Sequence, residues 1–156
     1  MIFREVRLAA LTHLPLLPST LDSIFLRVQD KDPSVRRHVF GTIFGSCRAN
    51  PRRLSAAQRQ ELIHRGLDDQ DESVSSAVNG MLCAWLMSCE VHDPMAPIHD
   101  GQIKDSTAGS IKGLLSFVDL FNLAASGSSV PFRALQQLFK VKSSLLHAIE
   151  FDGMIP

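Results

Sequence analysis

Asp30-Lys-Asp-Pro-Ser-Val35 is the stretch that decides the fold, because it returns 39 residues later as Asp69-Gln-Asp-Glu-Ser-Val74. Each copy lies between two segments whose apolar residues are spaced three and four apart, which is typical of amphipathic helices. In the first copy Asp32 suits a helix N-cap and Pro33 the first helical position. Two helices joined by a short turn cannot enclose a core alone, so the repetition predicts helix pairs that stack on one another.

The neighbouring segments extend this pattern in both directions. We expect a helix over 20–29 that Ser19 or Thr20 caps, a second from Pro33 to about Cys47, a third that starts with the capping box Ser55-Ala-Ala-Gln58 and ends at Gly66, and a fourth from Asp71. The second helix is expected to bury Val35, Val39, Phe40, Ile43 and Phe44. The fourth is expected to bury Val74, Ala77, Val78, Met81, Leu82 and Trp85.

A third, broken copy precedes the two complete ones. Val6-Arg-Leu-Ala-Ala-Leu11 matches Val35-Arg-Arg-His-Val-Phe40 and takes the place of the second helix of an earlier repeat. A period near 40 residues is typical of HEAT and armadillo arrays. The sequence therefore predicts an all-α, HEAT-type α-solenoid of antiparallel helix pairs. We expect HEAT repeats over 1–86, a disordered or inserted linker over 87–110, and a further incomplete helical repeat over 111–156.

The expected repeat over 111–156 rests on three shorter apolar patterns. Leu114, Leu115, Val118 and Phe121 predict one helix, Leu135, Leu138 and Phe139 a second that Ser129 caps, and Leu145, Leu146 and Ile149 the start of a third. A solenoid segment of this kind exposes apolar faces at both ends. We therefore expect the isolated chain to be marginally stable or to associate.

Composition limits the class of protein. The chain has 156 residues, 45% of them apolar, which suffices for one modest core. Its three cysteines are too few for a disulfide framework, and the sequence shows neither a secretory signal nor an apolar run long enough to cross a bilayer, so we expect an intracellular protein. The formal net charge is zero, yet residues 1–65 carry eleven basic and five acidic side chains, which gives this part a net charge of +6.

Several blocks, in this order, resemble one family. They are Val6-Arg-Leu-Ala-Ala-Leu11, Pro18-Ser-Thr-Leu21, Arg27-Val-Gln-Asp-Lys-Asp32, Val35-Arg-Arg-His-Val-Phe40, Leu54-Ser-Ala-Ala-Gln-Arg59, Gly66-Leu-Asp-Asp69 and Met81-Leu-Cys-Ala-Trp85. Together they resemble the HEAT-repeat region of the condensin complex subunit 3 family, the G-type non-SMC chromosome-associated proteins. Members are several times longer, so the chain resembles a fragment. The resemblance implies a non-catalytic scaffold that binds the kleisin subunit, reaches the SMC ATPases through it, and grips double-stranded DNA.

The resemblance also implies a role in mitotic chromosome condensation, with a location in the nucleus and on chromosomes, and in the cytoplasm outside mitosis. The candidate phosphate contacts are arginines at helix ends and in an inter-repeat loop: Arg36, Arg37, Arg48, Arg52, Arg53 and Arg59, with Arg65 close by. The alternative for these residues is a solvated face with local ion pairs, such as one from Asp30 or Asp32 to Arg36. In the second repeat Ser75 and Ser76 replace Arg36 and Arg37.

No sequence signal points to catalysis. The chain contains no phosphate loop, dinucleotide loop, nucleophile elbow or H-E-x-x-H pair, so we assign no catalytic residue and no cofactor. Cys89-x-x-His92, with His99 and Cys83, lacks a fourth zinc ligand at ordinary spacing, and we expect no metal site. Trp85 is expected to be a packing anchor. The alternative function is a HEAT or armadillo-type protein-interaction adaptor that does not bind DNA.

Overall fold

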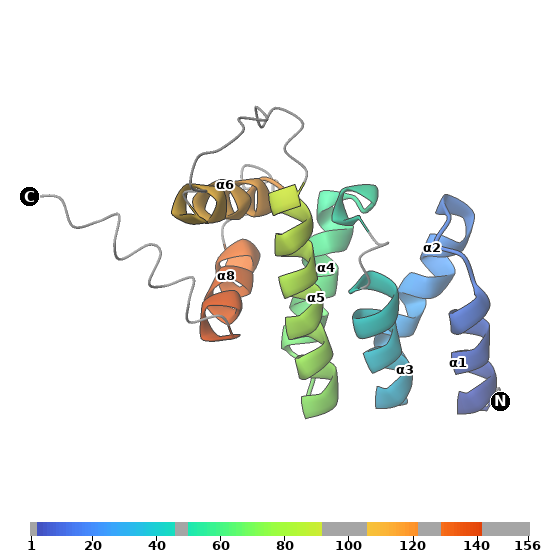
Figure 1. Ribbon diagram of the computed structural model, residues 1–156. Helices are drawn as coiled ribbons and strands as arrows, with labels where there is room; N and C mark the ends of the chain where they lie inside the picture. Colours follow the sequence, from blue (N-terminus) through green and yellow to red (C-terminus); the bar gives the residue numbers. More distant parts are fainter. Residues whose placement is uncertain (1–2, 46–49, 92–105, 122–128, 142–156) are drawn as a thin grey trace, which may run out of the picture.

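A computed structural model describes residues 3–45, 50–91, 106–121 and 129–141, and these residues form helices joined by turns and short irregular segments, with no strand among them. Two layers of helices stack side by side (Figure 1). One layer contains α1 (Arg4–His13), α3 (Pro33–His38) and α5 (Glu72–Val91), and the other contains α2 (Pro18–Phe25) and α4 (Ala56–Leu67). This arrangement confirms the predicted all-α array of helix pairs. No helix in the described part of the chain is both long and apolar enough to span a membrane.

The repeated turn has the same hydrogen bonds in both copies. Asp30 accepts the backbone N–H of Asp32 at 3.0 Å, and Asp69 accepts that of Asp71 at 2.9 Å. Asp32 then caps α3 by accepting the N–H of Ser34 at 2.9 Å, with Pro33 at the first helical position as predicted. The repetition in the sequence is thus a repetition of local backbone geometry.

The starts of α2 and α4 differ in how closely they follow the prediction. Ser55 accepts the N–H of Gln58 at 3.1 Å and its own N–H binds the Gln58 side chain at 2.9 Å, which is the predicted capping box. In contrast, α2 begins earlier than expected, at Pro18. Thr20 therefore lies inside the helix, where its hydroxyl accepts the N–H of Leu17 at 3.0 Å.

Gly66 does not end α4, contrary to the prediction. The helix continues to Leu67, and Asp68 is its C-cap. A Cβ atom at Gly66 would lie 2.5 Å from Cγ2 of Val78 and 3.1 Å from Cε1 of Phe40. The glycine is needed because α4 packs so closely on Val78 of α5 and on Phe40, which follows α3, that no side chain fits.

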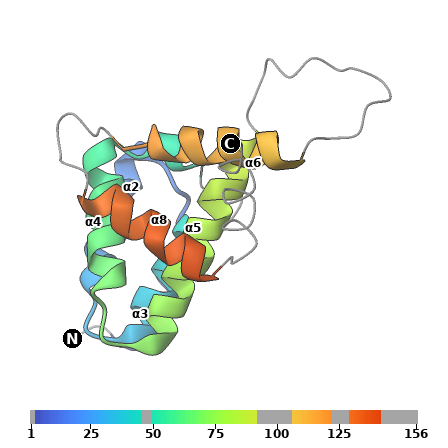
Figure 2. The same ribbon diagram turned by 90° about the vertical axis from the view of Figure 1, so that its left-hand side faces the viewer.

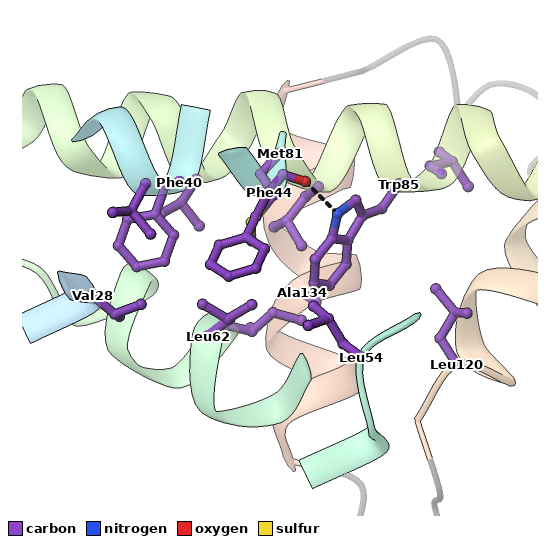
Figure 3. Packing of buried hydrophobic residues seen from close by; sticks show 14 of the residues in the cluster. Val28, Phe40, Phe44, Leu54, Leu62, Met81, Trp85, Leu120 and Ala134 are labelled. Atoms are coloured by element: carbon purple, nitrogen blue, oxygen red, sulfur yellow. Dashed lines mark hydrogen bonds between the residues drawn. The ribbon is translucent and has the colours of Figure 1, made fainter. Parts of the chain in front are cut away.

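The segment after α3 also differs from the expected straight helix. Residues Val39–Phe44 form a π-helical segment, η2, and residues 46–49 lie outside the described part. Phe40 and Phe44 are both fully buried, whereas Ile43 is only partly buried. Trp85 fits beside the end of η2, where its indole N–H donates to the Phe44 carbonyl at 2.8 Å (Figure 3). Its exposed fraction is 1%, which confirms that it is a packing anchor.

The remaining elements are two 3-10 turns and two helices. They are η1 (Leu26–Gln29), η3 (Pro51–Arg53), α6 (Ser106–Val118) and α8 (Ser129–Val141). α6 crosses the end of α5, and α8 lies against α4 and α5 (Figure 2). Both helices close the side of the array formed by the second complete repeat.

Helices extend into both ends of the expected linker over 87–110. α5 continues to Val91 and α6 already begins at Ser106, so residues 87–91 and 106–110 are helical, while 92–105 lie outside the described residues. Leu115 was expected inside but is exposed, and Phe117 is buried instead. Ser129 is the first residue of α8 rather than its cap. The helix start predicted over 145–149 lies outside the described residues.

Candidate functional site

Arg36 is bound between the two repeated turns. Its Nε and Nη2 atoms donate to the two carboxylate oxygens of Asp69 at 2.7 and 2.9 Å, and Nη1 donates to the Asp30 carbonyl at 2.8 Å. Only 18% of the Arg36 side chain and 8% of the Asp69 side chain is exposed. The hydrogen bond from Arg36 holds the pKa of Asp69 below its ordinary value.

The preceding repeat contains an equivalent contact. Arg7 follows Val6 as Arg36 follows Val35, and its Nη2 donates to Asp30 at 2.8 Å, where Arg27 also approaches at 3.4 Å. Burial is the largest effect on Asp30 and raises its pKa, but the Asp32 N–H and Arg7 together lower it below its ordinary value. Each turn is thus braced by an arginine of the preceding repeat.

The sequence predicts an ion pair for Arg36, and the structure contains one, but with a different aspartate. The sequence pointed to an ion pair from Asp30 or Asp32 to Arg36 within one turn, whereas the carboxylate that Arg36 binds belongs to Asp69 of the next repeat. The paired recurrence of Val-Arg and of the aspartates was the signal for this contact. In the last complete copy Ser75 replaces the arginine, and its hydroxyl donates to the Asp69 carbonyl at 3.4 Å.

Arg59 lies in the core, although it was a candidate phosphate contact. Its Nε donates to the Leu120 carbonyl at 2.7 Å, and Nη1 donates to the carbonyls of Pro51, at 2.8 Å, and Leu54. Its exposed fraction is 9%. Burial, followed by the nearby charge of Arg52, lowers the pKa of this guanidinium. Arg59 thus ties α4 to η3 and to the turn after α6.

Three of the candidate arginines are exposed, namely Arg37, Arg52 and Arg53, while Arg48 lies outside the described residues. Arg53 lines an apolar cavity of about 360 Å³, and Arg37 lines a different one of about 300 Å³ together with His38, whose pKa burial lowers. Arg65 is paired with Glu61 one helical turn earlier. Among the described arginines, Arg37 and Arg53 thus line different cavities.

A polar groove of about 430 Å³ lies between the two turns and is lined by Asp30, Arg36, His64 and Asp69, among others. Its polar side chains already have partners: Arg36 and Asp69 form the inter-repeat pair, Asp30 accepts from Arg7, and His64 Nδ1 lies 3.1 Å from Asp68. The hydrogen bond from Arg36 lowers the pKa of Asp69, and a hydrogen bond from Arg133 lowers that of Asp68. The groove contains no nucleophile activated by a neighbouring base.

The described residues contain no group of three metal-binding side chains. Cys89 is buried in the core and Cys83 is partly exposed, while His92 and His99 of the weak cysteine–histidine pattern lie outside the described part. Within the described residues, the geometry thus offers exposed cations and cavities for binding.

Comparisons with known proteins confirm the resemblance found in the sequence. The chain is 27% identical over 148 residues to condensin complex subunit 3 of Schizosaccharomyces pombe, which covers 94% of this chain and 14% of that protein. It also matches a chain in the crystal structure of the S. pombe condensin Cnd3-Cnd2 subcomplex, with a TM-score of 0.73 and 25% identity over 93% of this chain and 16% of the other. The chain thus spans about one seventh of its relative. No protein-family model matches it.

Proposed function

We propose that this chain is a HEAT-repeat segment of a condensin subunit 3-type protein and serves as a non-catalytic scaffold. The observation that carries the proposal is the structural match to a chain of the Cnd3-Cnd2 subcomplex, which covers 93% of this chain with a TM-score of 0.73. The same relative emerges from the sequence comparison over 94% of the chain. An array held by packing and inter-repeat ion pairs presents long surfaces to partners and needs no reactive group.

The proposed partner is a kleisin subunit, and through it the SMC ATPases. The support is that the matching structure is a subcomplex of Cnd3 with Cnd2. In this proposal the segment acts in mitotic chromosome condensation, in the nucleus and on chromosomes, and is cytoplasmic outside mitosis. The test is isothermal titration of the chain with the kleisin subunit of the same organism. Saturable binding supports the proposal. If titration at micromolar concentrations gives no heat of binding, the proposal that this segment binds the kleisin is contradicted.

The proposal includes contact with the phosphates of double-stranded DNA by Arg37, Arg52 and Arg53, with Arg48 as a further candidate. The support is that the first three side chains are exposed. Arg36 and Arg59 are left out because carboxylate and carbonyl oxygens already bind their guanidinium groups. Phosphate contacts of this type carry no sequence preference and release counterions, so binding should weaken steeply with salt.

The test for DNA is binding of a short labelled duplex over a salt series. The Arg37→Glu, Arg52→Glu, Arg53→Glu triple variant is expected to lose most of the affinity and of the salt slope. The matched control reverses Arg4, Lys31 and Lys140 to Glu, which changes the net charge equally at other exposed positions. Equal losses in both variants would show an effect of net charge alone. Absence of binding by the wild type would favour the adaptor without a DNA role.

A further inference from the structure

The apolar cavity beside Arg53 lies where the start of α2 meets η3 and the end of η2. Its wall is formed mainly by apolar side chains, among them Leu17, Leu21, Phe44, Leu54 and Trp85. Its volume is about 360 Å³. A cavity of this size with apolar walls and few polar groups has the features of a site that takes a large apolar side chain or a small ligand.

The polar part of the rim carries only positive charge. Arg53 lines the cavity, Arg52 is its exposed neighbour in the chain, and none of the described residues lining the cavity is acidic. Arg52 also lies close enough to Arg59 to lower the pKa of that buried guanidinium, whose hydrogen-bond acceptors are carbonyls. Three guanidinium groups thus share this corner without a carboxylate on the cavity wall, which favours an anionic partner.

The backbone at the rim is held in place before any partner binds. Asn50 accepts the N–H of Arg52 at 2.9 Å, and the Arg53 N–H donates to the Asn50 carbonyl at 3.0 Å. Trp85 is fixed by its hydrogen bond to Phe44. A site with a fixed backbone and a fixed aromatic wall loses little conformational entropy on binding.

We propose that this cavity and rim, defined by Leu17, Leu21, Phe44, Trp85, Arg52 and Arg53, bind an extended acidic peptide segment of a partner protein. A large apolar side chain of the peptide fills the cavity, and flanking carboxylates pair with Arg52 and Arg53. The apolar cavity distinguishes this partner from DNA. The phosphates of a DNA backbone could pair with Arg52 and Arg53, but the backbone has no apolar group that would fill the cavity.

The test uses the full chain and defined probes. The first probe is a fluorescein-labelled acidic hexapeptide with two central phenylalanines between aspartates, compared with the same peptide carrying serines in the centre and with one carrying lysines at the flanks. Fluorescence anisotropy should show that the first peptide binds at least tenfold more tightly than either of the others. When the first peptide is added without its fluorescein label, the emission maximum of Trp85, the only tryptophan in the sequence, should shift.

Two variants separate the cavity from the charge. Leu17→Trp narrows the cavity at a side chain that is 49% exposed, and Arg53→Glu reverses the rim charge; each should weaken peptide binding at least tenfold. Leu26→Trp, at an exposed leucine that does not line the cavity, and Lys31→Glu, at an exposed lysine that does not line it either, are the matched controls and should bind as wild type. Thermal unfolding of all four variants checks that they fold.

The proposal is overturned if the serine peptide binds as tightly as the phenylalanine peptide, because the cavity would then contribute nothing. It is equally overturned if Leu17→Trp leaves binding intact, or if no peptide binds at millimolar concentration. A short DNA duplex provides the last arm. If the duplex displaces the peptide and only Arg53→Glu, not Leu17→Trp, affects the peptide and the duplex, this corner is a phosphate surface and not a peptide site.

Discussion

Burial decides what each arginine of this chain can do. Arg36 and Arg37 are neighbours in the sequence, yet one binds the carboxylate of the next repeat while the other is exposed. Arg59 is enclosed by main-chain carbonyls. At this scale, the charge pattern identifies candidates, and the position of each side chain relative to the core decides among them.

At the residue scale, we first predict an acid-sensitive brace between repeats. The pKa of Asp69 is lowered by Arg36, and that of Asp30 is also lowered, so these groups stabilise the fold above the unfolded-state pKa of about 3.9 and lose this contribution as the pH falls through their lower folded-state values. The free energy of unfolding in urea should therefore decline below about pH 4. Asp69→Asn should make this decline shallower, whereas Asp22→Asn, at an exposed side chain on α2, should leave it unchanged.

A second residue-scale prediction concerns two glycines. Gly66→Ala should destabilise the chain by about 1–3 kcal/mol, because the new Cβ meets Val78 at 2.5 Å and the overpacking exceeds the gain in helix propensity. Gly80→Ala, where nothing lies within 4 Å of the new atom, should instead be neutral or stabilising by up to about 1 kcal/mol. Urea unfolding of both variants decides this. A neutral Gly66→Ala variant would mean that α4 and α5 are less closely packed than described.

At the scale of elements, α8 shows that packing and surface charge contribute unequally. Ala134 and Leu138 are buried against the core, with exposed fractions of 0% and 1%. Arg133 pairs with Asp68 at the end of α4, but both side chains are more than 40% exposed. The apolar face should therefore hold the helix in place, and the ion pair should add orientation more than stability.

We accordingly predict that Leu138→Ala destabilises the chain by about 2–4 kcal/mol, because it leaves a cavity between α8 and its neighbours. Arg133→Ala should cost about 1 kcal/mol or less. Thermal unfolding gives the order of the two variants, and hydrogen exchange of α8 locates the effect. If Arg133→Ala were the more destabilising of the two, the ion pair would be the main attachment of this helix.

At the scale of the whole molecule, the two ends of the array are unequal. α6 and α8 cover the side formed by the second complete repeat (Figure 2). At the other side, Phe3 is 76% and Val6 is 55% exposed, whereas Val35 and Val74, which hold the place of Val6 in the later repeats, are fully buried. This apolar position is buried in the later repeats and exposed only in the first, which indicates that the exposed face around Phe3 and Val6 is suited to packing against another apolar surface.

The whole-molecule prediction is that the isolated chain associates through this face. Sedimentation velocity should show a mean mass that rises with protein concentration, and the Phe3→Ser, Val6→Glu double variant should stay closer to 17.2 kDa because its face is polar. Leu115→Ser, at an exposed leucine of α6, is the control and should associate as wild type. A monomeric wild type with cooperative unfolding at all concentrations would contradict the prediction.

The sequence by itself determined the helix pairs, the repeated aspartate turn, the capping box at Ser55 and the buried faces of α3 and α5, because these depend on local spacing and on hydrogen bonds between near neighbours. Only the tertiary structure decided that Gly66 serves close packing, that Arg36 binds Asp69, and that Arg59 is buried. These contacts join segments 33 and 61 residues apart, or two packed helices, and the spacing of near neighbours in the chain does not specify which distant groups meet. Burial follows from the packing of all elements together. It therefore decides which arginines hold the repeats together and which are exposed for binding a partner.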